Sequence, residues 1–150
     1  MDYKLKRLNR ELASPGKALE FYRDTMELPD GRTEKWDFVH HKKGGGACVV
    51  PVLPDGRVLM IHQYRPAVDR ETTELPAGAF DADDPDFAVT ASRELEEETG
   101  FRSENIEWLV SINSWPAFTN EVVEIFVARD LIPSKQKFDE EESIELEEYT

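Results

Sequence analysis

The glutamates Glu94, Glu97 and Glu98 constrain this chain more than any other feature of its sequence. Their spacing of i, i+3 and i+4 places all three side chains on one strip of a helix. Three like charges on one strip repel each other unless a cation lies between them, and carboxylate oxygens suit Mg²⁺ or Mn²⁺. A solvated helix face would carry the same acids without a metal, so the spacing alone leaves both interpretations open.

The residues on either side of these acids predict where the helix begins and ends. Asp84–Pro85 has the pattern of an N-cap followed by proline at the first helical position. Thr99–Gly100 has the pattern of a C-terminal stop, with glycine directly after the helix. Between these limits an apolar stripe lies on a different side from the acids and consists of Ala88, Ala91 and Leu95. We expect the helix to pack one face and to present carboxylates on another.

The sequence around the acids resembles the Nudix box, G-x5-E-x7-R-E-U-x-E-E-x-G-U, in which U is a bulky apolar residue. Gly78 matches the first glycine, and residues 93–101 match every specified position of the second half. Asp84 stands where the box has its first glutamate, and one extra residue separates it from Arg93. The resemblance implies an α+β fold, the Nudix α/β/α sandwich, with a mixed central sheet and an N-terminal antiparallel strand region.

The resemblance also implies a metal-dependent hydrolase of pyrophosphate bonds. This chemistry needs charge neutralisation at the phosphoryl oxygens, an oriented water and a base. By resemblance, Glu94 and Glu98 bind metal directly, and Glu97 binds or supports a second ion and takes part in catalysis. The backbone carbonyl of Ala77 is a further ligand, and Arg93 orients the acids through ion pairs. Two or three ions of Mg²⁺ or Mn²⁺ are expected in each site.

A second acidic segment provides the candidate base. Residues 138–145 resemble the acidic loop of ADP-ribose pyrophosphatases, whose pattern places the base at Glu140 and another metal ligand at Glu142. Glu141 is a substitute for the base. Runs of charge are usually solvated, so the catalytic interpretation and a plain acidic loop both stay open.

Two further segments resemble the substrate site of the ADP-ribose branch. Pro116 lies 15 residues after Phe101, the spacing that marks this branch, and the loop around it includes Phe118. Residues 63–65 resemble the Q-x-R motif of the branch, whose arginine contacts the diphosphate, as bidentate guanidinium geometry allows. Arg65 is therefore a candidate substrate-binding residue, against the alternative of a surface arginine at a strand end. Glu74 is a further candidate.

Trp36 and Phe38 are the aromatic candidates for substrate binding. They alternate along an extended segment and share a face, so they could stack a nucleobase across a dimer interface. Packing in a core is the alternative, and it is the more common environment of aromatic residues.

Turn signals predict short strands around the helix. Pro29–Gly31 and Pro54–Gly56 predict hairpin turns, and the second would join strands at 47–53 and 58–64. Periodicity does not decide between helix and strand at 17–27, where the resemblance favours a strand. Further strands are expected at 72–77, 106–112, 121–128 and 143–148. The resemblance to nucleoside diphosphate sugar hydrolases implies that residues 1–45 form a strand region that dimerises with exchange of strands. Residues 46–150 are expected to form the catalytic domain.

Charge and composition exclude several classes of function. The net charge is −14: residues 1–46 carry +2 and the remaining residues carry −16, a balance that disfavours nucleic-acid binding. No run of 18 apolar residues exists to span a membrane, and the N-terminus lacks the pattern of a signal peptide, so we expect a cytoplasmic protein. The single cysteine, Cys48, lies in an apolar run and is expected to be buried and inert.

The sequence therefore predicts hydrolysis of nucleoside diphosphate sugars, with ADP-ribose first, to a nucleoside monophosphate and a sugar phosphate. A Nudix-like sensor that binds ADP-ribose without cleavage is one alternative. Another Nudix substrate, such as a dinucleoside polyphosphate or GDP-mannose, is a second. The resemblance also implies a last strand and a C-terminal helix after the acidic loop, and the sequence stops at Thr150.

Overall fold

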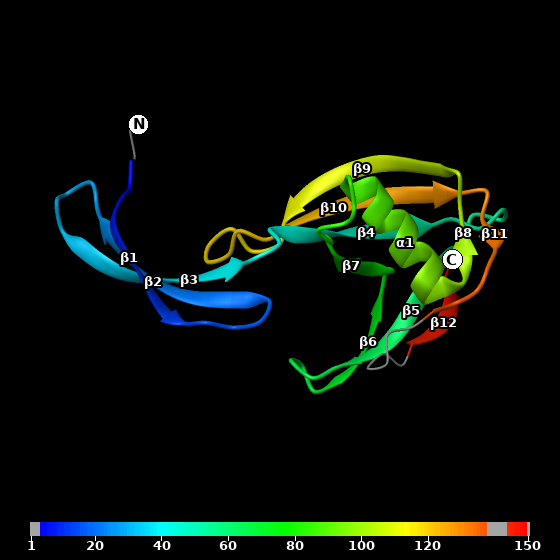
Figure 1. The fold of residues 1–150 in the computed structure, drawn as a ribbon, viewed down its shortest axis with the longest axis horizontal. Coiled ribbons are helices and arrows are strands. Elements are labelled where there is room, and N and C mark those ends of the chain that lie inside the picture. Colours follow the sequence, from blue (N-terminus) through cyan, green and yellow to red (C-terminus); the bar gives the residue numbers. More distant parts are fainter. Residues whose placement is uncertain (1–3, 138–143, 150) are drawn as a thin grey trace. The chain divides into compact units, whose positions relative to one another are not determined.

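The computed structural model describes residues 4–137 and 144–149. Contacts within the chain divide it into two compact units (Figure 1). The first unit contains residues 1–45 and 113–122, and the second contains residues 46–112 and 123–150.

The described residues form one helix and twelve strands. In chain order these are β1 (Lys6–Ser14), β2 (Leu19–Glu27), β3 (Thr33–His41), β4 (Gly45–Pro51), β5 (Val58–Arg65), β6 (Arg70–Glu74), β7 (Ala77–Ala79), α1 (Phe87–Thr99), β8 (Phe101–Arg102), β9 (Asn105–Asn113), β10 (Val122–Arg129), β11 (Ile132–Pro133) and β12 (Ile144–Tyr149).

The first unit is built on an antiparallel sheet of three strands in the order β1-β2-β3. The segment whose periodicity was ambiguous is a strand, β2, because it pairs with a neighbour along both edges. The turn predicted at residues 29–31 is confirmed: the Gly31 N–H donates to the Leu28 carbonyl at 2.9 Å. Gly31 has a φ of 83°, which glycine adopts without strain.

The second unit contains a four-stranded sheet in the order β7-β4-β10-β9 and a three-stranded sheet in the order β12-β5-β6. The helix α1 packs on the four-stranded sheet (Figure 1). The core at this contact combines apolar residues of β4, β10 and α1: Ala47, Val49, Phe126, Ala128, Ala91 and Leu95. The α+β class expected from the sequence is confirmed, and α1 is the one helix that the described residues contain.

The helix begins later than the sequence predicts. Asp86 is the N-cap instead of Asp84, and its side chain accepts a hydrogen bond from the Val89 N–H at 3.0 Å. The Asp84 carboxylate instead accepts from the Thr90 hydroxyl at 2.9 Å. The predicted C-terminal end is confirmed, since Gly100 follows the helix with a φ of 70° and donates its N–H to the Glu96 carbonyl.

The turn predicted at residues 54–56 is present and joins β4 to β5, but these two strands do not form an extended hairpin. The Gly56 N–H donates to the Leu53 carbonyl at 2.9 Å, but beyond one bridge between Val52 and Val58 the two strands enter different sheets. Pro51 and Pro54 contribute to this separation, because neither has an N–H to donate to a ladder.

The strand predicted at 72–77 is also shorter than expected. It ends at Glu74, before Pro76, and Ala77–Ala79 forms the separate strand β7, which pairs with β4. The strands expected at 106–112, 121–128 and 143–148 are observed as β9, β10 and β12, the last described from Ile144. No helix in the described part of the chain is both long enough and apolar enough to cross a membrane.

Cys48 is buried and free, as the sequence predicts. Burial, together with the negative charges of Glu98 and Glu74, raises the pKa of its thiol to about 11. Near neutral pH little thiolate, the reactive form, is present, so Cys48 behaves as a core residue.

Candidate active site

Two of the predicted metal ligands on α1 reach the same short strand. The Ala77 N–H, on β7, donates to Oε2 of Glu98 at 3.0 Å. At the next residue, a Cβ built on Gly78 would overlap the carboxylate of Glu94. A glycine at position 78 therefore allows the Glu94 carboxylate to lie against the backbone of β7. The structure brings Ala77, Glu94 and Glu98 together, with the contact at Ala77 made by its N–H, and their role as metal ligands stays a prediction.

Arg93 joins the acids of the motif to each other. Its Nη1 donates to Glu94 Oε1 at 2.7 Å and to Glu97 Oε2 at 3.0 Å. Its Nη2 donates to Asp84 Oδ2 at 3.1 Å. One guanidinium thus bridges three carboxylates, which gives Asp84 a structural role despite its shifted spacing. The orienting role expected for Arg93 agrees with these contacts.

The charges around Arg93 change the proton affinities in this cluster. Burial alone would lower the pKa of Arg93, but its hydrogen bonds to Asp84, Glu97 and Glu94 and the charge of Glu94 raise that pKa well above its ordinary value. For Asp84, burial raises the pKa, and the hydrogen bonds from Arg93 and Thr90 outweigh it, so that the pKa is lowered. Both groups are held in their charged forms.

The carboxylates do not all lie on an open face, which corrects the expectation from the helix pattern. Glu98 is 3% exposed and is buried together with Leu95. Residue 98 is i+3 from Leu95, so it lies at the border of the apolar stripe. The exposed fraction of the side chain rises to 12% for Glu94 and 34% for Glu97. The acids therefore extend from the core toward solvent.

The carboxylates of Glu94 and Glu98 approach β7 beside Gly78, and carboxylate oxygens suit a hard divalent cation. In the part of the chain that the structure describes, no group of three or more histidine, cysteine, aspartate or glutamate side chains is arranged to hold a metal ion. Glu140, Glu141 and Glu142 lie outside the described residues. A complete ligand set would need backbone oxygens, water or residues beyond those described.

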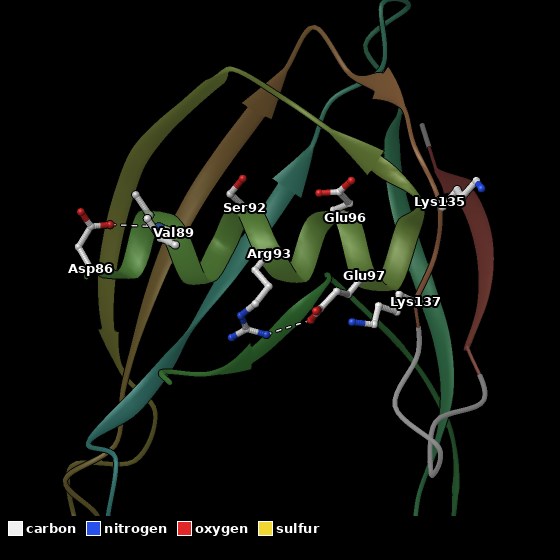
Figure 2. A pocket seen from close by; sticks show the side chains of 9 residues that line it. Asp86, Val89, Ser92, Arg93, Glu96, Glu97, Lys135 and Lys137 are labelled. Carbon is white, nitrogen blue, oxygen red and sulfur yellow. Dashed lines mark hydrogen bonds and ion pairs between the residues drawn. The ribbon is translucent and has the colours of Figure 1, made fainter. Parts of the chain in front are cut away.

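A cavity of about 550 Å³ lies on the outer face of α1 (Figure 2). Arg93 and Glu97 project on one side of the helix, and Ser92 and Glu96 project on another. Lys135 and Lys137 lie beside the C-terminal end of the helix and complete the lining. The ion pair between Arg93 and Glu97 is therefore open to this cavity.

Arg65 and Glu74, two predicted substrate-binding residues, pair with each other. Arg65 donates from Nε and Nη2 to the two carboxylate oxygens of Glu74, at 2.9 and 2.6 Å. The hydrogen bonds from Arg65 lower the pKa of Glu74 against the effect of burial. The guanidinium thus already holds one bidentate oxyanion, the geometry by which it would hold a phosphate.

The loop around Pro116 belongs to the first unit and lies against β3. The Val39 N–H donates to the Phe118 carbonyl at 2.7 Å, and Trp115 stacks near Phe118 with ring centroids 5.6 Å apart. Pro116 itself lies exposed in the turn of the loop. A cavity of about 320 Å³ borders this loop and is lined by Leu19, Val39, His41, Ser114, Trp115, Phe118, Thr119 and Glu121.

Asn120 fixes this loop and was missed by sequence reasoning. Its Oδ1 accepts from the His41 N–H at 2.8 Å, and its Nδ2 donates to the His41 carbonyl at 3.2 Å. The two residues are 79 positions apart, so no local pattern in the sequence could have revealed the contact.

Trp36 and Phe38 share a face of β3 but have different surroundings. The Arg10 guanidinium carbon lies 4.1 Å from the centroid of the Phe38 ring, so Phe38 already has a cationic partner. Trp36 remains 42% exposed. Of the two aromatic side chains, Trp36 is the more accessible to a ligand.

The candidate residues are therefore divided between the two units. The second unit holds the box residues together with Arg65 and Glu74, whereas the first holds Trp36, Phe38, Pro116 and Phe118.

The chain is similar to known proteins in both sequence and structure. The family model of the NUDIX domain matches residues 42–149. Over 148 residues the chain is 35% identical to the "Methanol dehydrogenase activator" of Bacillus methanolicus and 33% identical to the "ADP-ribose pyrophosphatase" of Bacillus subtilis. Each match covers 97% of this chain and 78% of the relative.

A solved structure of an ADP compounds hydrolase shares the fold. It matches with a TM-score of 0.85 at 21% sequence identity, over 97% of this chain and 78% of that one. The family model covers most of the chain, and its range includes the box and the helix that carries the box acids. The chain therefore belongs to the Nudix family.

Proposed function

We propose that this protein hydrolyses the pyrophosphate bond of nucleoside diphosphate sugars, with ADP-ribose as its first substrate. The products are a nucleoside monophosphate and a sugar phosphate. The observation that carries the proposal is the arrangement of Glu94 and Glu98 against Ala77 and Gly78, with Arg93 bridging the outer acids. The relative named as an ADP-ribose pyrophosphatase supports the choice of substrate.

Nudix hydrolases generally depend on a divalent metal, and the donors present fit one. We propose that Glu94, Glu97, Glu98 and the Ala77 carbonyl hold two or three ions of Mg²⁺ or Mn²⁺, with Glu142 as a further ligand. When bound, such ions neutralise the phosphoryl oxygens and lower the pKa of a bound water. Arg93 orients Glu94 and Glu97 through its hydrogen bonds, and the hydrogen bond from the Ala77 N–H holds Glu98.

The proton of the attacking water would pass to Glu140, or to Glu141 in its place. Arg65 would exchange its partner Glu74 for the diphosphate, since both offer paired oxygens at similar spacing. Trp36 would stack on the nucleobase, while Phe38 supports the same face. Pro116 and Phe118 would shape the ribose end of the site.

We also propose a homodimer in which residues 1–45 provide the contact, with exchange of strands. A single sheet layer needs a partner to bury its apolar side chains. In the first unit Leu8, Leu12 and Leu19 are each 47% exposed. Light scattering on the wild type and on Leu8→Glu/Leu12→Glu tests this: a dimer that becomes a monomer supports the proposal, and a wild-type monomer refutes it. A cytoplasmic location stays a prediction.

The activity is tested by product analysis with Mg²⁺ and a panel of ADP-ribose, GDP-mannose, UDP-glucose, a dinucleoside polyphosphate and dGTP. We expect AMP and ribose 5-phosphate from ADP-ribose, and loss of both products in Glu98→Gln. One of the relatives is named for an effect on another enzyme, so turnover has to be measured directly. Binding of ADP-ribose without cleavage would refute hydrolysis in favour of a sensor, and cleavage of another member of the panel would change the substrate.

A further inference from the structure

The last turn of α1 is electrostatically unfavourable. Glu96, Glu97 and Glu98 lie there, at the end where the helix dipole is negative and the last carbonyl groups have no partner within the helix. The last turn contains no basic residue to offset them. Donors from elsewhere in the chain must therefore stabilise this end, where two of the proposed metal ligands are located.

Residues 134–137, which we call the strap, supply these donors. The Lys137 N–H donates to the Glu97 carbonyl at 3.0 Å, and the side-chain amide of Gln136 donates to the Glu98 carbonyl at 2.9 Å. The Ser134 N–H donates to the Gly100 carbonyl at 2.6 Å, and its hydroxyl donates to the Glu96 carboxylate. The strap thus provides hydrogen-bond donors for successive acceptors at the C-terminal end of the helix.

Gln136 differs from its neighbours in the strap because it reaches the helix carbonyl with a side chain. A substitution can remove this hydrogen bond without changing the backbone contacts on either side of it. The surroundings are closely packed: a Cβ added to Gly100 would lie 3.0 Å from Cγ of Gln136. The glycine that ends the helix therefore also makes room for the glutamine.

We propose that Gln136 is a positioning residue that acts through Glu98. The backbone of Glu98 is held by Gln136, and its carboxylate is held by the Ala77 N–H at 3.0 Å. These two hydrogen bonds fix Glu98 from opposite ends of the residue, in a site where it is 3% exposed. Without the amide of Gln136, the last turn loses one constraint, and the proposed ligands Glu97 and Glu98 bind a divalent cation less tightly.

This inference rests on the proposed function, and its test separates the two. Gln136→Met keeps the volume of the side chain and removes the donor. Asp86→Ala is the matched control, because it removes a hydrogen bond from the other end of the same helix, the N-cap bond to Val89. Mn²⁺ binding is measured by electron paramagnetic resonance without substrate, together with Tm, kcat, KM for ADP-ribose and the Mg²⁺ concentration for half-maximal rate.

We expect Gln136→Met to weaken Mn²⁺ binding roughly tenfold, as the loss of a residue that orients a ligand does. The Mg²⁺ requirement should rise in parallel, with KM for ADP-ribose at saturating Mg²⁺ unchanged. Asp86→Ala should lower Tm at least as much and leave Mn²⁺ affinity unchanged.

Equal Mn²⁺ affinity in Gln136→Met and wild type would overturn the inference, as would equal weakening in both variants. If the wild type binds Mn²⁺ but cleaves no member of the panel, the proposed hydrolysis fails and the binding comparison still decides the role of Gln136. A wild type that binds no Mn²⁺ overturns both.

Discussion

Gly78 leaves the space that the Glu94 carboxylate occupies, because a Cβ at residue 78 would overlap that carboxylate. Gly78→Ala is therefore expected to displace Glu94 and to abolish most of the metal-dependent activity. Gly56→Ala is the control: it meets no atom within 4 Å and has a φ of 88°, so it should cost about 1 kcal/mol of stability and leave activity intact. Comparable losses of activity in both variants would contradict the steric explanation.

Arg93→Lys should behave as a severe substitution although it keeps the charge. The guanidinium bridges Asp84, Glu94 and Glu97 from two nitrogens, and a single ammonium group cannot reproduce this fork. We expect kcat/KM for ADP-ribose to fall roughly 10- to 100-fold, as for other residues that orient ligands. Steady-state kinetics measure this fall, and circular dichroism checks the fold. Wild-type kinetics in Arg93→Lys would show that the bridge has no role in catalysis.

Asp84→Asn should reduce stability in a pH-dependent manner. The pKa of Asp84 is lowered in the folded protein, so its contribution to stability is present above the ordinary aspartate pKa and is lost as the pH falls through the lowered value. At pH 7 we expect a loss of about 1–3 kcal/mol in the free energy of unfolding. Urea unfolding from pH 7 to pH 3 should show this difference shrink below a pH of about 4. A difference that is constant with pH would refute the assignment.

Asp24 is expected to be the most important ionic residue of the first unit. It is 6% exposed and accepts from Nε and Nη2 of Arg10 at 2.7 and 2.6 Å. Asp24→Ala leaves Arg10 without its partner and should lower the free energy of unfolding by about 3 kcal/mol. The exposed pair of Arg23 and Asp37 provides the control, since Asp37→Ala should change stability by about 1 kcal/mol or less. Amide hydrogen exchange in residues 4–45 would measure the change in stability in each of the two variants.

Trp36→Ala tests the proposed stacking on the nucleobase. We expect KM for ADP-ribose to rise roughly tenfold, since stacking on a base is worth about 1–3 kcal/mol, with little change in kcat. Trp108→Ala is a control of equal size on β9, where Trp108 is 61% exposed and donates to Glu124. An unchanged KM in Trp36→Ala would remove Trp36 from the substrate site.

The sequence predicts the central motif well because the motif is local. Helix periodicity and the C-terminal glycine locate the acids on α1, and the family resemblance adds Gly78 and the fold. The sequence predicts the N-cap at Asp84, and the structure has it at Asp86. Both aspartates precede the helix, and only their contacts distinguish them: Asp84 with Thr90 and Arg93, and Asp86 with the Val89 N–H. Two residues of the same type in one short segment cannot be separated by propensity.

Contacts between distant residues could not be predicted from the sequence. Gln136 meets Glu98 across 38 positions, and neither residue belongs to a pattern that points to the other. The strands β4 and β5 are joined by a turn of a kind that usually connects two paired strands. Here β4 pairs with β7 and β10, and β5 pairs with β6 and β12. Pairing of this kind depends on competition among all the strands, which a local signal does not contain.

Because residues 113–122, between β9 and β10, belong to the first unit, one cut in the sequence cannot separate the two units. Residues 113–122 belong to the first unit, where Phe118 and Asn120 are hydrogen-bonded to Val39 and His41. A shortened protein that starts at Gly46 would therefore leave this insertion without its docking strand. The N-terminal sheet cannot be removed as a separate module, because the polypeptide returns to the first unit at residues 113–122, after α1 in the sequence. Exchanging it between related proteins would require grafting two pieces of sequence together.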